Sequence, residues 1–198
     1  MKKYPNMFSV TVLSVGFFMI FLTDNTTMNL SSVVLSKTGF GDWGFYNVAF
    51  YFLCLGIGSI FSNPIVLFLK EKLSIVISAF TVCFWVICYC LPAFKSENPE
   101  SNDFYARESF IKALMFISSL LYGFLSGPLW VAQGLLLSNY ATEITKGFYN
   151  SFFFAFFTGS NIFGNLIAAF VLEDFSIRKL FIILSAIAFS GALVFLML

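Results

Sequence analysis

One acidic residue, Asp24, lies well inside an apolar stretch of the sequence. A carboxylate at the centre of a bilayer costs about 2.5 to 3.5 kcal/mol on insertion scales, so it is typical of an ion or proton pathway. Counted from Phe8 at 1.5 Å per residue, however, Asp24 lies about 24 Å along a hydrocarbon core of about 30 Å. The sequence therefore leaves two interpretations open, an ion or proton site and a hydrated charge at the far mouth of a membrane.

A second set of polar side chains follows one helical face near the end of the chain. Asn161 and Asn165 are four residues apart, and Thr158 extends the same stripe by one turn. Such a stripe is typical either of a pathway lining or of hydrogen bonds between helices, which contribute under about 1 kcal/mol each in a membrane. Both interpretations stay open at this point.

Enzyme chemistry is not indicated by the remaining residues. The chain has no His, and we find no pair of nucleophile and base and no phosphate-binding glycine loop. Its four cysteines lie in apolar runs and are predicted to be core or lipid-facing residues; they are Cys54, Cys83, Cys88 and Cys90. We therefore predict no catalytic residue, no metal site and no cofactor. The scattered charges, with a net charge of +1, indicate no nucleic-acid partner.

Composition and length indicate which elements carry these side chains. Only 11% of the 198 residues are charged and 59% are hydrophobic, including 29 Phe. A soluble domain carries about 25% charge, so the solvent for most of this chain is predicted to be lipid. Twelve membrane-spanning helices need about 240 residues, whereas six need about 120. Six spans therefore fit this length and twelve do not.

The predicted fold class is all-α, a polytopic membrane protein with six transmembrane helices in a single domain, residues 1–198. Apolar runs bounded by charge place the spans at about 8–35, 44–69, 73–91, 110–138, 148–172 and 180–198. A solvated loop is expected over 94–108, where Lys, Glu, Asn and Pro are frequent. The alternative that the first apolar run is a cleaved signal peptide is weak, because no small-residue cleavage site follows Leu22.

Polar residues within the spans predict which helices face the interior. They concentrate in the first, fourth and fifth spans, whereas the third and sixth carry mainly hydroxyl groups and are predicted to face lipid. The residues proposed to form a cavity or a partner-binding face are Asp24, Asn25, Thr27, Asn29, Trp130, Gln133, Thr158, Asn161 and Asn165. We expect a membrane-protein partner or self-association to cover this polar face.

Small residues in the fourth span predict close helix packing. Gly123 and Gly127 form a G-x-x-x-G motif, and Gly134 follows one heptad later. The basic residues are divided almost equally between the two predicted sides. The short basic turn Lys70-Glu-Lys72 favours a cytoplasmic amino terminus.

Three stretches resemble the Unc-ninety-three-like family, a branch of the major facilitator superfamily. They are Asn25-Thr-Thr-Met-Asn-Leu-Ser-Ser32, Leu129-Trp-Val-Ala-Gln-Gly134, and the run from Lys146-Gly-Phe to Gly164-Asn165. The resemblance covers the whole chain and corresponds to the amino-terminal half of a family member. It implies a six-helix bundle in which the first and fourth helices line a cavity and the third and sixth lie at the lipid-facing periphery. The sequence departs from the family at Met28 and at the Lys70–Lys72 turn, where glycine is usual.

Family members are associated with regulating potassium channels and with escorting receptors between membranes. The resemblance therefore implies a regulatory or accessory subunit of an ion channel, a receptor or a larger membrane complex. One alternative is a half-transporter that moves an ion or small solute as a dimer. Another is an inactive fragment of a twelve-helix transporter.

Overall fold

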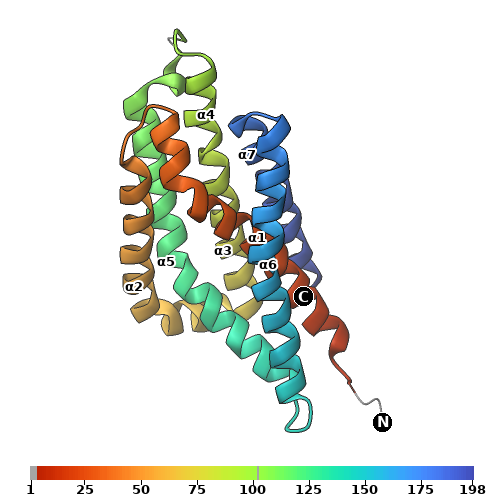
Figure 1. Cartoon of the computed structure of the whole chain (residues 1–198). Helices are drawn as coiled ribbons and strands as arrows, with labels where there is room; N and C mark the ends of the chain where they lie inside the picture. Colours follow the sequence, from red (N-terminus) through yellow and green to blue (C-terminus); the bar gives the residue numbers. More distant parts are fainter. Residues whose placement is uncertain (1–3, 102) are drawn as a thin grey trace.

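The computed structural model describes residues 4–101 and 103–198, and every regular element in this part of the chain is helical. The elements are α1 (Met7–Lys37), α2 (Trp43–Leu69), α3 (Glu71–Cys88), α4 (Cys90–Glu97), the 3-10 turn η1 (Phe104–Ala106), α5 (Glu108–Tyr140), α6 (Lys146–Asp174), α7 (Ile177–Val194) and the 3-10 turn η2 (Phe195–Met197). With α3 and α4 as one span, six helices are long and apolar enough to cross a membrane. The predicted all-α class with six such helices is confirmed (Figure 1).

The third span is longer than predicted and is interrupted once. The helix breaks at Tyr89 and resumes as α4 through Glu97, so the predicted loop that begins at Phe94 is wrong over its first four residues, 94–97. Pro92 is the third residue of α4, a position in the first turn where a helix tolerates the missing N–H. The other helices differ from the predicted spans by a few residues at their ends.

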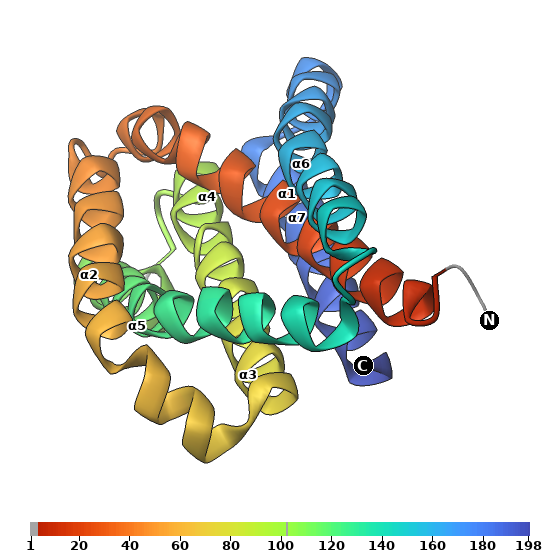
Figure 2. The same ribbon diagram turned by 90° about the horizontal axis from the view of Figure 1, so that it is seen from below.

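The pairing of the helices has an internal symmetry. The principal contacts join α2 with α5, α1 with α6, α3 with α5, α1 with α7, and α3 with α7. The first three spans correspond in order to the last three, α1 to α5, α2 to α6 and α3 to α7. Exchanging the corresponding helices converts each of these pairs into another pair or into itself. This is the pattern of two three-helix repeats, which is the arrangement found within each half of major-facilitator transporters. Figure 2 shows the result, with α2 and α6 on opposite sides and α1 running between them.

Glycines allow the two equivalent contacts, α2 with α5 and α1 with α6, to be close. A Cβ atom at Gly58 of α2 would overlap the backbone carbonyl of Phe124 and lie 2.8 Å from its Cα atom. A Cβ atom at Gly164 of α6 would lie 2.5 Å from the carbonyl oxygen of Leu22. In both repeats, a glycine of the middle helix therefore lies against the backbone of the first helix of the other repeat.

The predicted glycine motif of the fourth span contributes to this packing in part. A Cβ atom at Gly123 would overlap the carbonyl of Tyr51, and one at Gly127 would lie 2.6 Å from Ser62 Oγ. Gly134 differs, because it is exposed and no heavy atom lies within 4 Å of its added Cβ atom. The packing prediction therefore does not hold for Gly134 within this chain, since α5 has passed beyond α2 at that point.

Burial differs from the prediction for the third and sixth spans. The least buried spans are α2 and α6, whereas more than half of the most apolar part of the third span is buried. The outer faces of α3 and α7 are apolar and exposed, as Phe80 and Phe189 illustrate, with ring centroids 6.0 Å apart. Their inner faces pack on α1 and α5. The low polar content of these spans therefore predicted the exposure of their outer faces but not the burial of their inner faces. A hydroxyl bonded to its own helix also fits a contact between helices.

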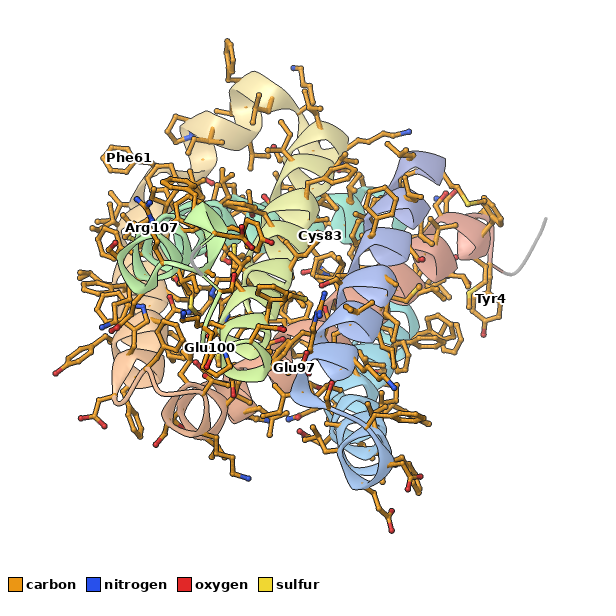
Figure 3. All side chains as sticks on the ribbon, turned by 90° about the horizontal axis from the view of Figure 1, so that it is seen from above. Tyr4, Phe61, Cys83, Glu97, Glu100 and Arg107 are labelled. Carbon is orange, nitrogen blue, oxygen red and sulfur yellow. The ribbon has the colours of Figure 1, made fainter. Side chains whose placement is uncertain are left out.

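The exposed face of α2 is strongly apolar. Phe61 is 50% exposed and points away from the bundle, whereas Cys83 of α3 lies among the helices and is only partly exposed (Figure 3). A shallow groove of about 600 Å³ beside Phe61 is also lined by Phe68 and Phe124. Such a surface is suited to contact with lipid tails or with another apolar helix.

The turn between α2 and α3 keeps a glycine-like backbone although it lacks glycine. Lys70 has φ +69° and ψ +158°, a conformation that side chains other than glycine rarely adopt. We expect Lys70→Gly to stabilise the protein by about 1 kcal/mol, a rise in Tm of about 2–4 °C. Lys72→Gly, inside the first turn of α3, should lower Tm instead. A thermal melt of the purified protein in detergent checks both, and a lower Tm for Lys70→Gly would contradict the strain.

Candidate membrane-embedded polar site

The residues predicted to form one polar face divide into an exposed and a buried group. The exposed members are Asn29, Thr158, Asn161 and Asn165, the partly buried members are Asn25 and Trp130, and the buried members are Asp24, Thr27 and Gln133. The structure therefore brings the residues of α1 and α6 together at a surface and places most of the remaining side chains inside the bundle.

The three asparagines of the exposed group are held together by amide hydrogen bonds within α6 and between α1 and α6. Asn29 Nδ2 donates to Asn165 Oδ1 at 3.3 Å and to Asn161 Oδ1 at 3.5 Å. Asn165 Nδ2 donates to Asn161 Oδ1 at 2.8 Å, and one turn earlier Asn25 Nδ2 donates to Ser160 Oγ at 3.5 Å. We refer to Asn29, Asn161 and Asn165 as the asparagine face.

The asparagine face lies far from the ends of α6. At a rise of 1.5 Å per residue, Asn161 is about 22 Å along the helix from Lys146 and about 20 Å from Asp174. A helix that crosses a hydrocarbon core of about 30 Å places such a residue near the middle of the membrane. The amides are therefore exposed where lipid tails offer no hydrogen-bond partner.

Trp130 belongs to an aromatic cluster rather than to a polar surface. Its ring centroid lies 5.1 Å from those of Phe21 and Phe157 and 5.6 Å from that of Phe17. These rings come from α1, α5 and α6 and join the three helices beside the asparagine face. Gln133 is buried, at 6% exposure, on the next turn of α5.

Asp24 is enclosed by the bundle, with 2% of its surface exposed. The carboxyl group lies near the hydroxyl of Tyr122 on α5, although this pair does not meet hydrogen-bond geometry. The ring of Tyr122 packs on Tyr51 at 4.7 Å and on Trp85 at 5.3 Å. The interpretation of Asp24 as a hydrated charge at a membrane mouth does not fit this burial, because α2, α3 and α5 close around it.

A buried hydrogen-bond network beside Asp24 was not predicted. Tyr89, at the break between α3 and α4, accepts from Asn47 Nδ2 at 2.8 Å and pairs with Ser31 Oγ at 2.6 Å. Ser119 Oγ donates to Asn47 Oδ1 and accepts from Trp85 Nε1 at 3.0 Å. All of these side chains are fully buried. The network joins α1, α2, α3 and α5, and a lone amide in the apolar start of α2 was its only sequence signal.

An open cavity of about 380 Å³ lies at one end of the bundle, between α1, α4, α6 and α7. Its walls are mainly apolar, and Lys37 and Glu97 contribute charges. None of the nine predicted residues lines it. The polar residues that the sequence singled out therefore act at the asparagine face and in the interior, and not in this cavity.

Comparison with known proteins relates the chain to one group. UNC93-like protein MFSD11 of Xenopus laevis is 23% identical over 201 residues, which cover 97% of this chain and 41% of that protein. UNC93-like protein 3 of Arabidopsis thaliana is 27% identical over 175 residues, which cover 83% of this chain and 33% of that protein. The chain is a relative of the UNC93-like proteins. The resemblance found in the sequence is thus confirmed.

The chain spans less than half the length of these UNC93-like relatives. Its six membrane-spanning helices in two three-helix repeats are consistent with one half of a larger protein of the major-facilitator type. No family model and no solved structure matches the chain. The relationship therefore rests on the UNC93-like relatives, and the chain is an integral, multi-pass membrane protein.

Proposed function

We propose that this chain is a subunit of a larger membrane complex, with a regulatory or accessory role toward an ion channel, a receptor or another membrane assembly. The asparagine face is the observation that supports this function. Amides exposed near the middle of a membrane-spanning helix are costly against lipid, since lipid tails cannot accept or donate hydrogen bonds. A second helical unit with polar side chains of its own satisfies them.

The surroundings of the asparagine face also suit a protein contact. Ile162, Phe163 and Leu166 are exposed on α6 beside the amides. Helices associate in lipid through close packing and interhelical hydrogen bonds, and this surface offers both. Either a second copy of the chain or a different membrane protein fits this description, and the experiment below separates the two.

Purification of the tagged chain from its native membrane in mild detergent tests the proposal. We expect a stoichiometric partner or a dimer, and the double variant Asn161→Leu, Asn165→Leu should recover at least tenfold less of it. Asn150→Leu is the matched control on the same helix, because the Asn150 amide donates to its own helix at Lys146 O, 2.8 Å away. A wild-type chain that runs as a partner-free monomer contradicts the proposal.

A second candidate function is that of a half-transporter for an ion or small solute. The enclosed carboxyl group of Asp24 favours it, because buried ionisable groups in a membrane commonly mark transport pathways. Since sites in this fold lie between two repeat-containing halves, a lone half acts with a second copy or another chain. In proteoliposomes, Asp24→Asn and Asn165→Ala should each reduce solute flux, and unchanged flux in both variants removes this candidate.

We propose that the amino terminus is cytoplasmic, as the basic turn Lys70-Glu-Lys72 favours. Asn6 Nδ2 donates to Tyr140 O at 2.8 Å, which places the end of α5 beside the amino terminus. Lys72 Nζ donates to Leu196 O at 2.8 Å, which places the α2–α3 turn beside the carboxyl-terminal end of α7 and η2. Figure 1 shows these segments at the lower end. Lys2 and Lys3, two further basic residues assigned to the same side from the sequence, lie outside the described residues. Protease cleavage of an amino-terminal tag only after permeabilisation of cells checks the orientation.

A further inference from the structure

Three buried oxygen atoms near the contact of α1 and α5 have no hydrogen-bond partner among the described residues. They are Asp24 Oδ1, Thr27 Oγ1 and Tyr122 Oη. The exposure of Asp24 is 2%, and Thr27 and Tyr122 are fully buried. Buried polar atoms in native proteins are nearly always paired, so a group of unpaired ones needs a physical explanation.

The three side chains come from two helices, and those of Asp24 and Tyr122 are neighbours. Asp24 and Thr27 are three residues apart on α1 and therefore share a face. Tyr122 brings its hydroxyl group close to the Asp24 carboxyl group from α5. Tyr51 of α2 stacks on Tyr122 with ring centroids 4.7 Å apart and closes the third side. Asp24 and Tyr122 therefore lie together inside the bundle, and Thr27 is buried on the same side of α1 as Asp24.

The negative charge of an ionised Asp24 carboxylate is not balanced by a positive side chain among the described residues. The titratable groups that face Asp24 are the hydroxyls of Tyr51, Tyr89 and Tyr122, and all of them are neutral when protonated. Both ion pairs in the described part of the chain lie at other residues. An ionised carboxylate away from water needs a counter-charge, and one positive charge is sufficient here.

We propose that Asp24, Thr27 and Tyr122 form a binding site for one dehydrated monovalent metal cation of the sodium class. Hard cations take oxygen ligands, and these residues offer a carboxylate and two hydroxyl oxygens. A proton on the Asp24 carboxyl group lets this group donate one hydrogen bond and so pairs at most one of the two hydroxyl oxygens, whereas a metal ion can take all three oxygens as ligands. A divalent ion is disfavoured, since no cluster of acidic, Cys or His ligands exists among the described residues. This site goes beyond the proposed function, because it needs no partner.

Sodium-dependent stability and binding test the site. The purified full chain in detergent is melted at pH 7.5 in sodium chloride and in choline chloride of equal ionic strength, and binding of radioactive ²²Na⁺ is measured at equilibrium. We expect sodium to raise Tm, since a ligand that binds only the folded state stabilises it, and to bind at one ion per chain. Asp24→Asn should abolish both effects, and Thr27→Val and Tyr122→Phe should each weaken binding at least tenfold.

Two matched variants control for the loss of a hydroxyl group. Thr26→Val removes a hydroxyl that already donates to Leu22 O at 2.7 Å. Tyr149→Phe removes a buried, unpaired hydroxyl on α6 beside Phe148. Both variants should bind sodium as the wild type does.

Three results would overturn the site. The first is equal Tm values in sodium and choline together with no sodium binding. The second is sodium binding that persists in Asp24→Asn. The third is stabilisation by acid in either salt without sodium binding, which indicates that the site binds a proton alone. If Asp24→Asn does not fold, Thr27→Val and Tyr122→Phe decide the question. Wild-type affinity in both of these variants also overturns it.

Discussion

Replacing Gly58 with alanine should strongly destabilise the protein, whereas the same change at Gly56, two residues away, should stabilise it. At Gly58 the new methyl group overlaps the backbone carbonyl of Phe124, which cannot move without separating α2 from α5. We expect a cost of about 3 kcal/mol, at the upper end for overpacked sites. At Gly56 no heavy atom lies within 4 Å of the added Cβ atom, so alanine contributes its helix propensity of about 1 kcal/mol.

Thermal unfolding in detergent and the yield of folded protein from membranes measure this difference. At about 2–4 °C per kcal/mol for a chain of this size, the Tm values of the two variants should differ by about 8–16 °C. Because both substitutions are the same and lie on one helix, general effects of alanine on insertion cancel. Equal Tm values would show that the α2–α5 contact is looser than the structure indicates.

Replacing Asn47 with leucine should destabilise the protein by about 1–3 kcal/mol. The substitution keeps the branched shape and the number of heavy atoms of the side chain but removes its hydrogen bonds to Tyr89 and Ser119. Tyr89 is then left with Ser31, and Ser119 with Trp85. Interhelical hydrogen bonds in membranes average about 0.6 kcal/mol and reach about 1.7 kcal/mol, and two are lost here. The expected fall in Tm is therefore several degrees.

A double-mutant cycle with Tyr89→Phe identifies the source of the loss. If the Asn47–Tyr89 bond contributes as described, the double variant should be more stable than the sum of the two single effects implies, by about 0.5 kcal/mol or more. Asn63→Leu is the matched control on α2, since Asn63 is exposed, and it should change Tm little. A purely additive cycle would mean that the bond contributes nothing to stability.

Local patterns were sufficient to predict the helices and one of the two polar groups. Long apolar runs ending at charges predicted six spans, because few structures other than helices satisfy their backbone in lipid. The i, i+4 spacing of Asn161 and Asn165 placed them on one face, and the structure adds Asn29 as their partner on α1. Periodicity within one helix was enough to place Asn161 and Asn165 on one face, whereas their pairing with Asn29 depends on a contact between helices.

The remaining features depend on contacts between distant segments, which spacing within one helix does not encode. Asn47 and Tyr89 carry no motif, and their hydrogen bond exists only because α2 meets the break between α3 and α4. Gly134 shares its spacing with a packing motif, but no heavy atom lies within 4 Å of its added Cβ atom. The enclosure of Asp24 depends on Tyr122 of α5, so a depth counted along a single helix could not reveal it.

The pairing of the helices also sets the order in which the protein can assemble. α1 is synthesised before the other described helices, but its principal partners, α6 and α7, follow at least four helices later in the sequence. The amides of α1 therefore leave the ribosome long before Asn161 and Asn165 are synthesised. The carboxyl group of Asp24 likewise leaves it before Tyr122 of α5. During that interval we expect the polar residues of α1 to lack their partners from α5 and α6. We therefore expect the bundle to assemble late, once α5, α6 and α7 are in the membrane, and a chain cut after α3 to leave α1 without these partners.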